Sequence, residues 1–176
     1  VPWTWWPYTD AGDNREANKE IKAIVGTSAM ETFPTPKPVK LIEKILALSA
    51  PADALVLDSF AGSGTTAHAV LKANASDNGK RRFIMIEMEE YADRITSARV
   101  QRAIEGYGEG TDAAPALGGG FDYYTVGEPM FLPDDNLNEA VGVEAIRAYV
   151  AYSEGIPPDD QTTAENPHSP YLLGLN

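Results

Sequence analysis

The chain has 176 residues, of which 43% are hydrophobic, and this is enough for one domain with an apolar core. It has no cysteine, so disulfides and cysteine-ligated zinc or iron–sulfur sites are excluded. No apolar run reaches the roughly 20 residues that span a membrane. No basic-then-apolar leader is present either, so we expect a cytoplasmic protein with no membrane contact.

The net charge of −12 is concentrated in the last third of the chain. Residues 1–104 hold 13 acidic and 13 basic side chains, whereas residues 105–176 hold 13 acidic side chains and one basic side chain, Arg147. An acidic segment of this kind repels phosphate backbones, which argues against a nucleic-acid contact there. It favours solubility or a basic protein partner.

The first 33 residues are expected to form an aromatic arm and a short helix. Residues 1–14 contain all three tryptophans and two prolines, which predict an irregular arm whose aromatic rings cover an apolar surface. Residues 15–25 carry apolar side chains at helical spacing, and Gly26 is a natural end for that helix.

A proline-rich segment, Phe33-Pro-Thr-Pro-Lys-Pro38, comes next and is predicted to be extended. Thr35 is expected to cap the following helix, whose apolar stripe begins at Leu41. Lys37 is fixed between two prolines, and it is either a solvated surface lysine or a clamp for an anion.

The centre of the chain is the sequence DSFAGSGTT at residues 58–66. It follows the apolar run 54–57, predicted to be a buried strand, and it precedes a predicted helix. A polar loop over 74–82 and a second strand over 83–86, ending on Glu87, complete a parallel strand–helix–strand unit. Glycines in the turn allow backbone N–H groups to approach a ligand closely.

The rest of the chain is predicted to contain a helix over 89–107 and a loop over 108–120. A third strand is expected over 121–126 and a helix over 138–152, followed by an irregular tail. The arginines of the first of these helices are expected to be solvated or salt-bridged rather than DNA-binding. We therefore expect an α/β core over residues 34–127, with a small, mostly parallel sheet and flanking helices, and an acidic C-terminal part over residues 128–176.

Three kinds of ligand compete for the glycine turn. A triphosphate is disfavoured because no lysine follows Gly64, as a P-loop requires. A dinucleotide matches Gly62-Ser-Gly-Thr-Thr-Ala67 formally, but Asp58 is unfavourable beside a pyrophosphate. S-adenosylmethionine fits the charges best. Asp58 can pair with its cationic end, Glu87 can accept both ribose hydroxyls, and Lys37 can take its carboxylate.

The order of FPTPKPVKLIEKIL, LVLDSFAGSGTTAHAVL and RRFIMIEMEEYADRITSARVQRA resembles the amino-methylating DNA methyltransferases. In particular, it is similar to the methylation subunit of type III restriction–modification systems and to adenine-N6 relatives with the same permuted, beta-class motif order. The resemblance covers residues 5–154. It implies a partial Rossmann-like fold that binds S-adenosylmethionine, without a metal.

This resemblance also implies roles for individual residues. The proline-rich segment would hold the cofactor carboxylate, the turn would hold the methionine portion with a hydrogen bond from Thr65, Glu87 would bind the ribose, and Met88 would pack on the adenine. The implied cofactor-binding residues are Thr35, Lys37, Pro38, Asp58, Phe60, Ala61, Gly62, Gly64, Thr65, Glu87 and Met88.

The family's catalytic tetrapeptide, Asp or Asn followed by Pro-Pro and an aromatic residue, is absent from this sequence. In the permuted order it would precede Thr35, so the chain resembles the C-terminal, cofactor-binding part of such an enzyme. We expect it to be inactive alone, with DNA bound through parts that this sequence lacks. Alternatives are a non-catalytic cofactor-binding or assembly module that acts with a partner chain, and a nicotinamide-dependent oxidoreductase.

The missing part has a physical consequence for the sheet. In the family, the strand that leads into the glycine turn pairs with the catalytic strand. Here the strand over 54–57 would be an exposed apolar edge, which favours association. We expect this edge to be covered by the tryptophan-rich arm, by a second copy of the chain or by a partner chain.

Overall fold

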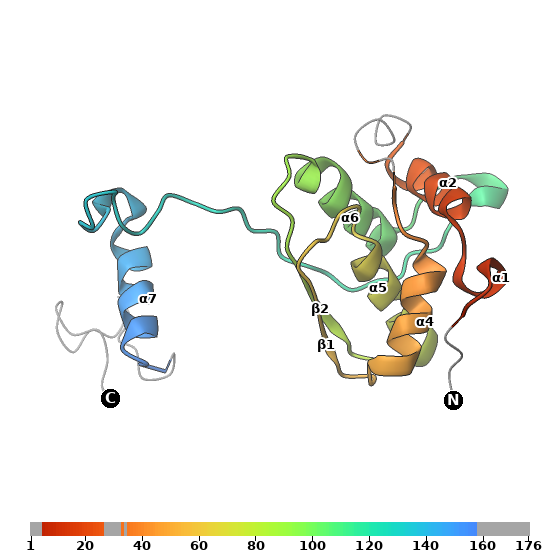
Figure 1. Ribbon diagram of the computed structural model, residues 1–176, viewed down its shortest axis with the longest axis horizontal. Coiled ribbons are helices and arrows are strands. Elements are labelled where there is room, and N and C mark those ends of the chain that lie inside the picture. Colours follow the sequence, from red (N-terminus) through yellow and green to blue (C-terminus); the bar gives the residue numbers. More distant parts are fainter. Residues whose placement is uncertain (1–4, 27–32, 34, 158–176) are drawn as a thin grey trace. The chain divides into compact units, whose positions relative to one another are not determined.

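The computed structural model describes residues 5–26, 33 and 35–157. The chain divides into two compact units, Val1–Tyr123 and Tyr124–Asn176 (Figure 1). The domain boundaries expected from the sequence, after residues 33 and 127, remain predictions. No helix in the described ranges is long and apolar enough to cross a membrane.

Two parallel strands and the helix between them form the centre of the first unit. Strand β1 spans Leu55–Asp58 and strand β2 spans Arg82–Met85, with Asp58 opposite Met85 in the ladder. Helix α5, Thr65–Asp77, connects the two strands. The predicted strand–turn–helix–strand order is therefore confirmed, and the unit is of the α/β class with a small parallel sheet.

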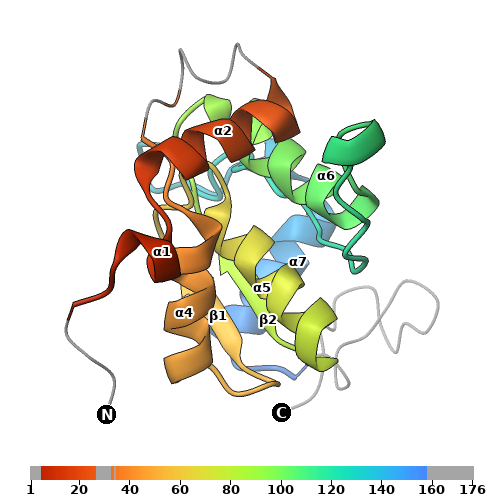
Figure 2. The same ribbon diagram turned by 90° about the vertical axis from the view of Figure 1, so that its right-hand side faces the viewer.

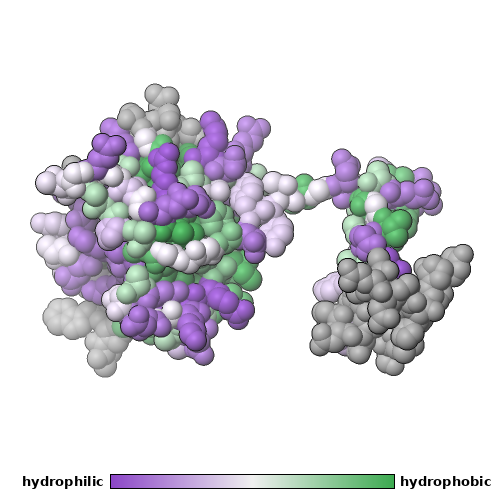
Figure 3. Space-filling view, turned by 180° about the vertical axis from the view of Figure 1, so that it is seen from behind, coloured by the Kyte–Doolittle hydropathy of each residue, from purple (hydrophilic) through white to green (hydrophobic). Residues whose placement is uncertain are grey.

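Helices cover one face of this sheet. Helix α4, Val39–Ser49, packs against α5, and both lie in front of the strands in Figure 2. Val56 and Phe83 point toward these helices and pack against their buried residues. Because side chains alternate along a strand, the neighbouring positions face the other way. Leu57, for example, is 63% exposed there. Apolar residues are also visible at the surface of the first unit in Figure 3.

The second buried cluster lies between α5 and the next helix. A π-helical segment, Ala92–Ser97, leads directly into α6, Ala98–Glu105. Val100 and Ala103 pack against α5 and against Phe83 of β2. The helix predicted over residues 89–107 is thus present, but its first part is wound as a π-helix.

The described part of the N-terminal arm contains a short helix where the sequence predicted an irregular arm. Helix α1 spans Tyr8–Ala11, with Pro7 immediately before it. Proline is tolerated at the start of a helix because the first N–H groups there have no partner in any case. Helix α1 packs on α4, and the Trp6 ring lies 5.3 Å from the ammonium group of Lys44. The described part of the arm therefore lies on α4, not on the edge of β1.

Helix α2, Asn14–Val25, confirms the helix predicted over residues 15–25. The Asp13 carboxylate caps it by accepting hydrogen bonds from the N–H groups of Arg15 and Glu16. The bond from the Glu16 N–H, followed by the bond from the Arg15 side chain, lowers the pKa of Asp13. Gly26 ends the helix, as expected. Ile21 is fully buried and packs with Ile95.

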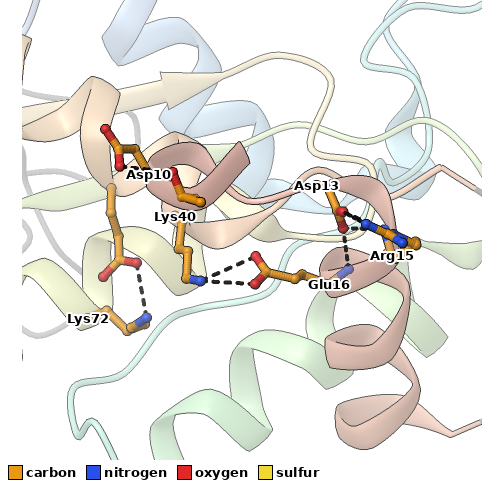
Figure 4. A network of polar contacts seen from close by, with 8 residues as sticks. Asp10, Asp13, Arg15, Glu16, Lys40 and Lys72 are labelled. Atoms are coloured by element: carbon orange, nitrogen blue, oxygen red, sulfur yellow. Dashed lines mark hydrogen bonds and ion pairs between the residues drawn. The ribbon is translucent and has the colours of Figure 1, made fainter. Parts of the chain in front are cut away.

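Ion pairs on the surface tie these N-terminal helices to α4 (Figure 4). Lys40 lies 3.0 Å from Glu16, and Lys44 lies 3.3 Å from Asp10. A further pair, Lys72–Glu43 at 3.0 Å, links α5 to α4. Exposed pairs of this kind contribute little stability, so the buried apolar clusters hold the helices together.

Two other segments differ from the sequence predictions. Helix α5 continues to Asp77 and ends at Asn78, which adopts the left-handed conformation that asparagine tolerates, so the polar loop is shorter than expected. Residues 121–126 form no strand, because no other strand in the described part of the chain pairs with them. Most of their side chains are exposed, while Phe121 packs on the second buried cluster.

The second unit is small. Asn138 caps a short 3-10 helix, Glu139–Val141, which precedes α7, Val143–Ser153. The Phe131 and Tyr149 rings pack edge to face, with their centroids 5.4 Å apart. The helix predicted over residues 138–152 is therefore present, with a break at Gly142 between its two parts.

A buried polar network joins α2, α5 and α6 behind the turn that follows β1. Its centre is Arg99 of α6, which is fully buried. Its guanidinium donates to Glu20 at 2.9 Å, to Thr65 at 2.9 Å, to Ser63 at 3.1 Å and to His68 Nδ1 at 3.4 Å. These contacts bring together residues from three helices and the turn.

Burial lowers the pKa of His68 to about 3, with further contributions from the Arg99 and Lys72 charges. The folded chain therefore keeps this imidazole neutral at a pH where the unfolded chain protonates it. Burial acts on Glu20 in the opposite direction and raises its pKa, which the Arg99 charge partly opposes.

We predict that His68 makes the chain less stable as the pH falls. Because its folded pKa lies below the ordinary value of 6.5, its contribution is complete above pH 6.5 and is lost as the pH falls toward 3. The slope from one such proton approaches about 1.4 kcal/mol per pH unit, and Glu20 partly offsets it. Urea unfolding between pH 7 and about pH 5 measures this slope.

The test variant is His68→Asn, which keeps an acceptor near the position of Nδ1. The control variant is His168→Asn, at the only other histidine of the sequence. The slope should decrease in the first variant and remain in the second. An unchanged slope in His68→Asn would contradict the assignment of this pH dependence to His68.

Candidate functional site

The site expected from the sequence lies where the carboxyl ends of β1 and β2 meet the glycine turn. The Ile86 N–H donates to the Asp58 carbonyl at 2.9 Å, and the Ala61 N–H donates to the Ile86 carbonyl at 2.9 Å. The turn is therefore hydrogen-bonded across the ends of both strands. In open α/β sheets, ligands bind at this end of the strands.

Asp58 ends β1, and its carboxylate faces the beginning of α5. One oxygen accepts from the Phe60 N–H at 3.1 Å, and the other accepts from the Thr66 hydroxyl at 2.6 Å. The positive end of the helix dipole favours an anionic side chain at this position. Asp58 is thus a fixed negative charge that remains partly exposed to solvent.

Glu87 follows β2 and contacts the turn from the neighbouring strand end. One of its oxygens accepts from the Gly62 N–H at 2.8 Å. The other accepts from the Met88 N–H at 2.9 Å and from the Glu89 N–H at 3.1 Å. A carboxylate has about four acceptor positions. In Glu87 the backbone occupies three of them, and the Tyr91 hydroxyl also hydrogen-bonds to this carboxylate.

The two glycines of the turn are required by its geometry. Gly62 and Gly64 have φ values of 53° and 76°, in the left-handed region that favours glycine. A Cβ on Gly62 would lie 2.9 Å from the Phe33 ring, and one on Gly64 would lie 3.0 Å from the Thr96 carbonyl. Neighbouring groups therefore approach both glycines too closely for a side chain.

The proline-rich segment lies beside this turn. The Thr65 hydroxyl donates to the Lys37 carbonyl at 3.2 Å. Pro36 and Pro38 are buried, whereas Thr35 and Lys37 are exposed. The cap expected at Thr35 is wrong, because Pro38 precedes the first residue of α4 and no side chain caps that helix.

Two large apolar side chains flank the strand ends. Phe60 is 85% exposed and Met88 is 89% exposed, so both offer apolar surface to a ligand. Ala61, in contrast, is buried. Thr65 is also buried, and its hydroxyl accepts a hydrogen bond from Arg99 in the interior, so the hydroxyl is already engaged within the chain.

The turn also has contacts that sequence reasoning did not identify. The Thr96 hydroxyl donates to the Gly62 carbonyl at 2.5 Å, and Arg99 donates to the Ser63 and Thr65 hydroxyls. Thr96 and Arg99 are three residues apart, which places them on one side of a helix. That spacing was the available signal, but nothing in the sequence indicates that this side faces the turn.

The arrangement can hold a cation at Asp58, a hydroxyl-bearing group at Glu87 and an anionic or polar group at the N–H groups of α5. A flat apolar group can lie against Phe60 or Met88. In the described part of the chain, no group of three or more acidic or histidine side chains is placed to hold a metal ion.

Comparisons with known proteins place these residues in a family. A family model described as DNA methylase matches residues 2–97, which is more than half of the chain. The StyLTI Mod subunit, a type III restriction-modification enzyme of Salmonella typhimurium, is 44% identical over 94 residues, covering 53% of this chain and 14% of that protein.

Two other relatives give a similar result. The EcoPI Mod subunit of Escherichia phage P1, also a type III restriction-modification enzyme, is 43% identical over 47% of this chain and 12% of its own length. The type II methyltransferase M.KpnI of Klebsiella pneumoniae is 46% identical over 40% of this chain and 16% of its own length.

The chain thus matches only about one seventh of the length of these curated relatives. The matched residues 2–97 nevertheless include the proline-rich segment, the glycine turn and both strand ends. The chain belongs to the DNA methylase family.

Proposed function

We propose that this chain provides the S-adenosylmethionine-binding part of a site-specific DNA methyltransferase that methylates exocyclic amines, with adenine N6 as the favoured acceptor. The single observation that carries the proposal is the hydrogen bond from the Gly62 N–H to Glu87 at 2.8 Å. It brings an acidic residue of one strand end against the glycine turn of the neighbouring strand. Membership of the DNA methylase family agrees with this reading.

The charges of the site support this cofactor. S-adenosylmethionine carries a sulfonium and an ammonium, which Asp58 can attract, and a ribose, which Glu87 can bind. A ribose that used both of its hydroxyls on Glu87 would replace some of the present contacts of that carboxylate, because three backbone N–H groups and Tyr91 already hydrogen-bond to it. In this proposal Lys37 would attract the cofactor carboxylate, and Met88 would cover the adenine.

Asp58 also argues against a nicotinamide dinucleotide. A dinucleotide bound at the turn would bring its pyrophosphate, which carries two negative charges, close to Asp58. The Asp58 carboxylate would repel it.

We further infer that the sheet is part of a larger Rossmann-like sheet, since it has one covered face and one face with exposed apolar residues such as Leu57.

We predict that two conservative substitutions, Asp58→Asn and Glu87→Gln, each weaken binding of S-adenosylmethionine about 10-fold or more, because each removes a charge-assisted contact. Isothermal titration calorimetry of the chain with the cofactor measures the affinity. The unsubstituted chain should bind S-adenosylmethionine in preference to NAD.

The matched control is Glu90→Gln, which removes an equal charge from an exposed residue three positions from Glu87. Its affinity should equal that of the unsubstituted chain. Unchanged affinity in both Asp58→Asn and Glu87→Gln would contradict the site, and tighter binding of NAD would favour an oxidoreductase instead.

The chain by itself is expected to transfer no methyl group. The sequence contains no tetrapeptide of the family's catalytic type, so nothing in it would hold a flipped base against the methyl donor. With radiolabelled S-adenosylmethionine and mixed-sequence DNA, incorporation should remain at the level of a protein-free blank. Labelled N6-methyladenine formed by the purified chain would contradict this expectation.

The alternative is a cofactor-binding or assembly module that works with a partner chain. In the described part of the chain, β1 pairs only with β2, and its other edge lies open. Leu55 and Leu57 expose apolar surface on the same strand. Since the described part of the aromatic arm lies on α4, a second copy or a partner chain is left to cover this edge.

We predict self-association of the purified chain, which static light scattering measures over a range of concentrations. The variant Leu57→Lys, which places a charge on the exposed face, should shift the chain toward monomer. Val126→Lys, at an exposed position in the second unit, is the control and should not. A purely monomeric chain at high concentration would contradict the prediction.

A further inference from the structure

We propose that Arg99 is a positioning residue for the cofactor, because it fixes the conformation of the glycine turn from the interior. The inference rests on the proposed cofactor site. Arg99 is fully buried and contacts the turn from the interior of the unit. It acts on the turn through Ser63 and Thr65 and touches no ligand itself.

The hydrogen bonds of Arg99 define this role. A single terminal nitrogen donates to the Thr65 hydroxyl at 2.9 Å, to the Ser63 hydroxyl at 3.1 Å and to the Ser63 carbonyl at 3.5 Å. The other terminal nitrogen donates to Glu20 at 2.9 Å, and Nε faces His68 at 3.4 Å. One planar group thus ties the turn to α2 and to α5.

The turn is held from both sides at successive residues. Gly62 donates to Glu87 on the open side, and its carbonyl accepts from Thr96 on the interior side. Ser63 is then bound by Arg99, and the Gly64 N–H donates to the Ala61 carbonyl at 2.8 Å. With these bonds in place, the peptide planes that lead into α5 have fixed orientations, and so do the first N–H groups of that helix.

A guanidinium suits this position better than an ammonium. Its donors point in fixed directions in one plane, so it can hold Glu20, His68 and the turn at the same time. A buried ion pair is seldom more stabilising than apolar side chains of the same size. Positioning of the turn therefore accounts for Arg99 better than stability of the fold does.

The deciding variant is Arg99→Lys, which keeps the buried charge beside Glu20 but cannot reach the turn with the same fork. We expect the variant to remain folded by circular dichroism and to bind S-adenosylmethionine about 10-fold more weakly than the unsubstituted chain. In two-dimensional ¹H–¹⁵N spectra without cofactor, the amide signals of Gly62 and Gly64 should shift. A role in stability alone would leave the affinity of the folded variant for S-adenosylmethionine unchanged.

The control is Lys72→Met, which removes the Lys72–Glu43 ion pair from the same helix that the turn leads into. It should leave the affinity and both glycine signals unchanged. Ser63→Ala removes one acceptor of Arg99 without disturbing the charges, so it should weaken binding by a smaller factor. If Arg99→Lys does not fold, the cofactor affinity of Ser63→Ala tests the proposed role of Arg99 instead.

Unchanged affinity and unchanged glycine signals in folded Arg99→Lys, or in Ser63→Ala if the first variant does not fold, would overturn the inference. If the unsubstituted chain does not bind S-adenosylmethionine, the proposed function fails instead. In that case the Gly62 and Gly64 signals still decide whether Arg99 fixes the turn.

Discussion

The contact between Gly62 and Glu87 is the interaction on which the site depends. A parallel ladder places the ends of β1 and β2 side by side, and the turn after β1 then folds across both of them. The turn can adopt this conformation because Gly62 and Gly64 have left-handed φ values and no side chains, which would meet the Phe33 ring and the Thr96 carbonyl. The acidic residues at the two strand ends consequently both contact this turn, and Asp58 also contacts Thr66 at the start of α5.

Hydrogen bonds hold the turn on its interior side as well as on the side that contacts Glu87. Thr96 and Arg99 reach it from the π-helical segment and α6, and Arg99 extends the network to Glu20 of α2. Residues far apart in the sequence thereby set the direction of a few backbone N–H groups. Local π-helical windings are frequent at functional sites, and here the winding brings Thr96 against the Gly62 carbonyl.

Local patterns in the sequence were sufficient to predict β1, α5, β2 and the positions of Asp58 and Glu87, since apolar runs and glycines define a strand–turn–helix–strand unit. They were insufficient for Arg99, because its partner Glu20 is 79 positions away and no periodicity connects them. The strand expected over residues 121–126 failed for a related reason. A strand needs a partner, and aromatic and β-branched residues alone do not supply one.

The most direct test is a crystal structure of the chain grown with S-adenosylhomocysteine, the product form of the proposed cofactor. The account predicts density at the carboxyl ends of β1 and β2, with the ribose within hydrogen-bonding distance of Glu87 and the amino-acid portion over the Gly62–Gly64 turn. Ligand density elsewhere on the chain, or an empty turn in crystals saturated with the ligand, would contradict it.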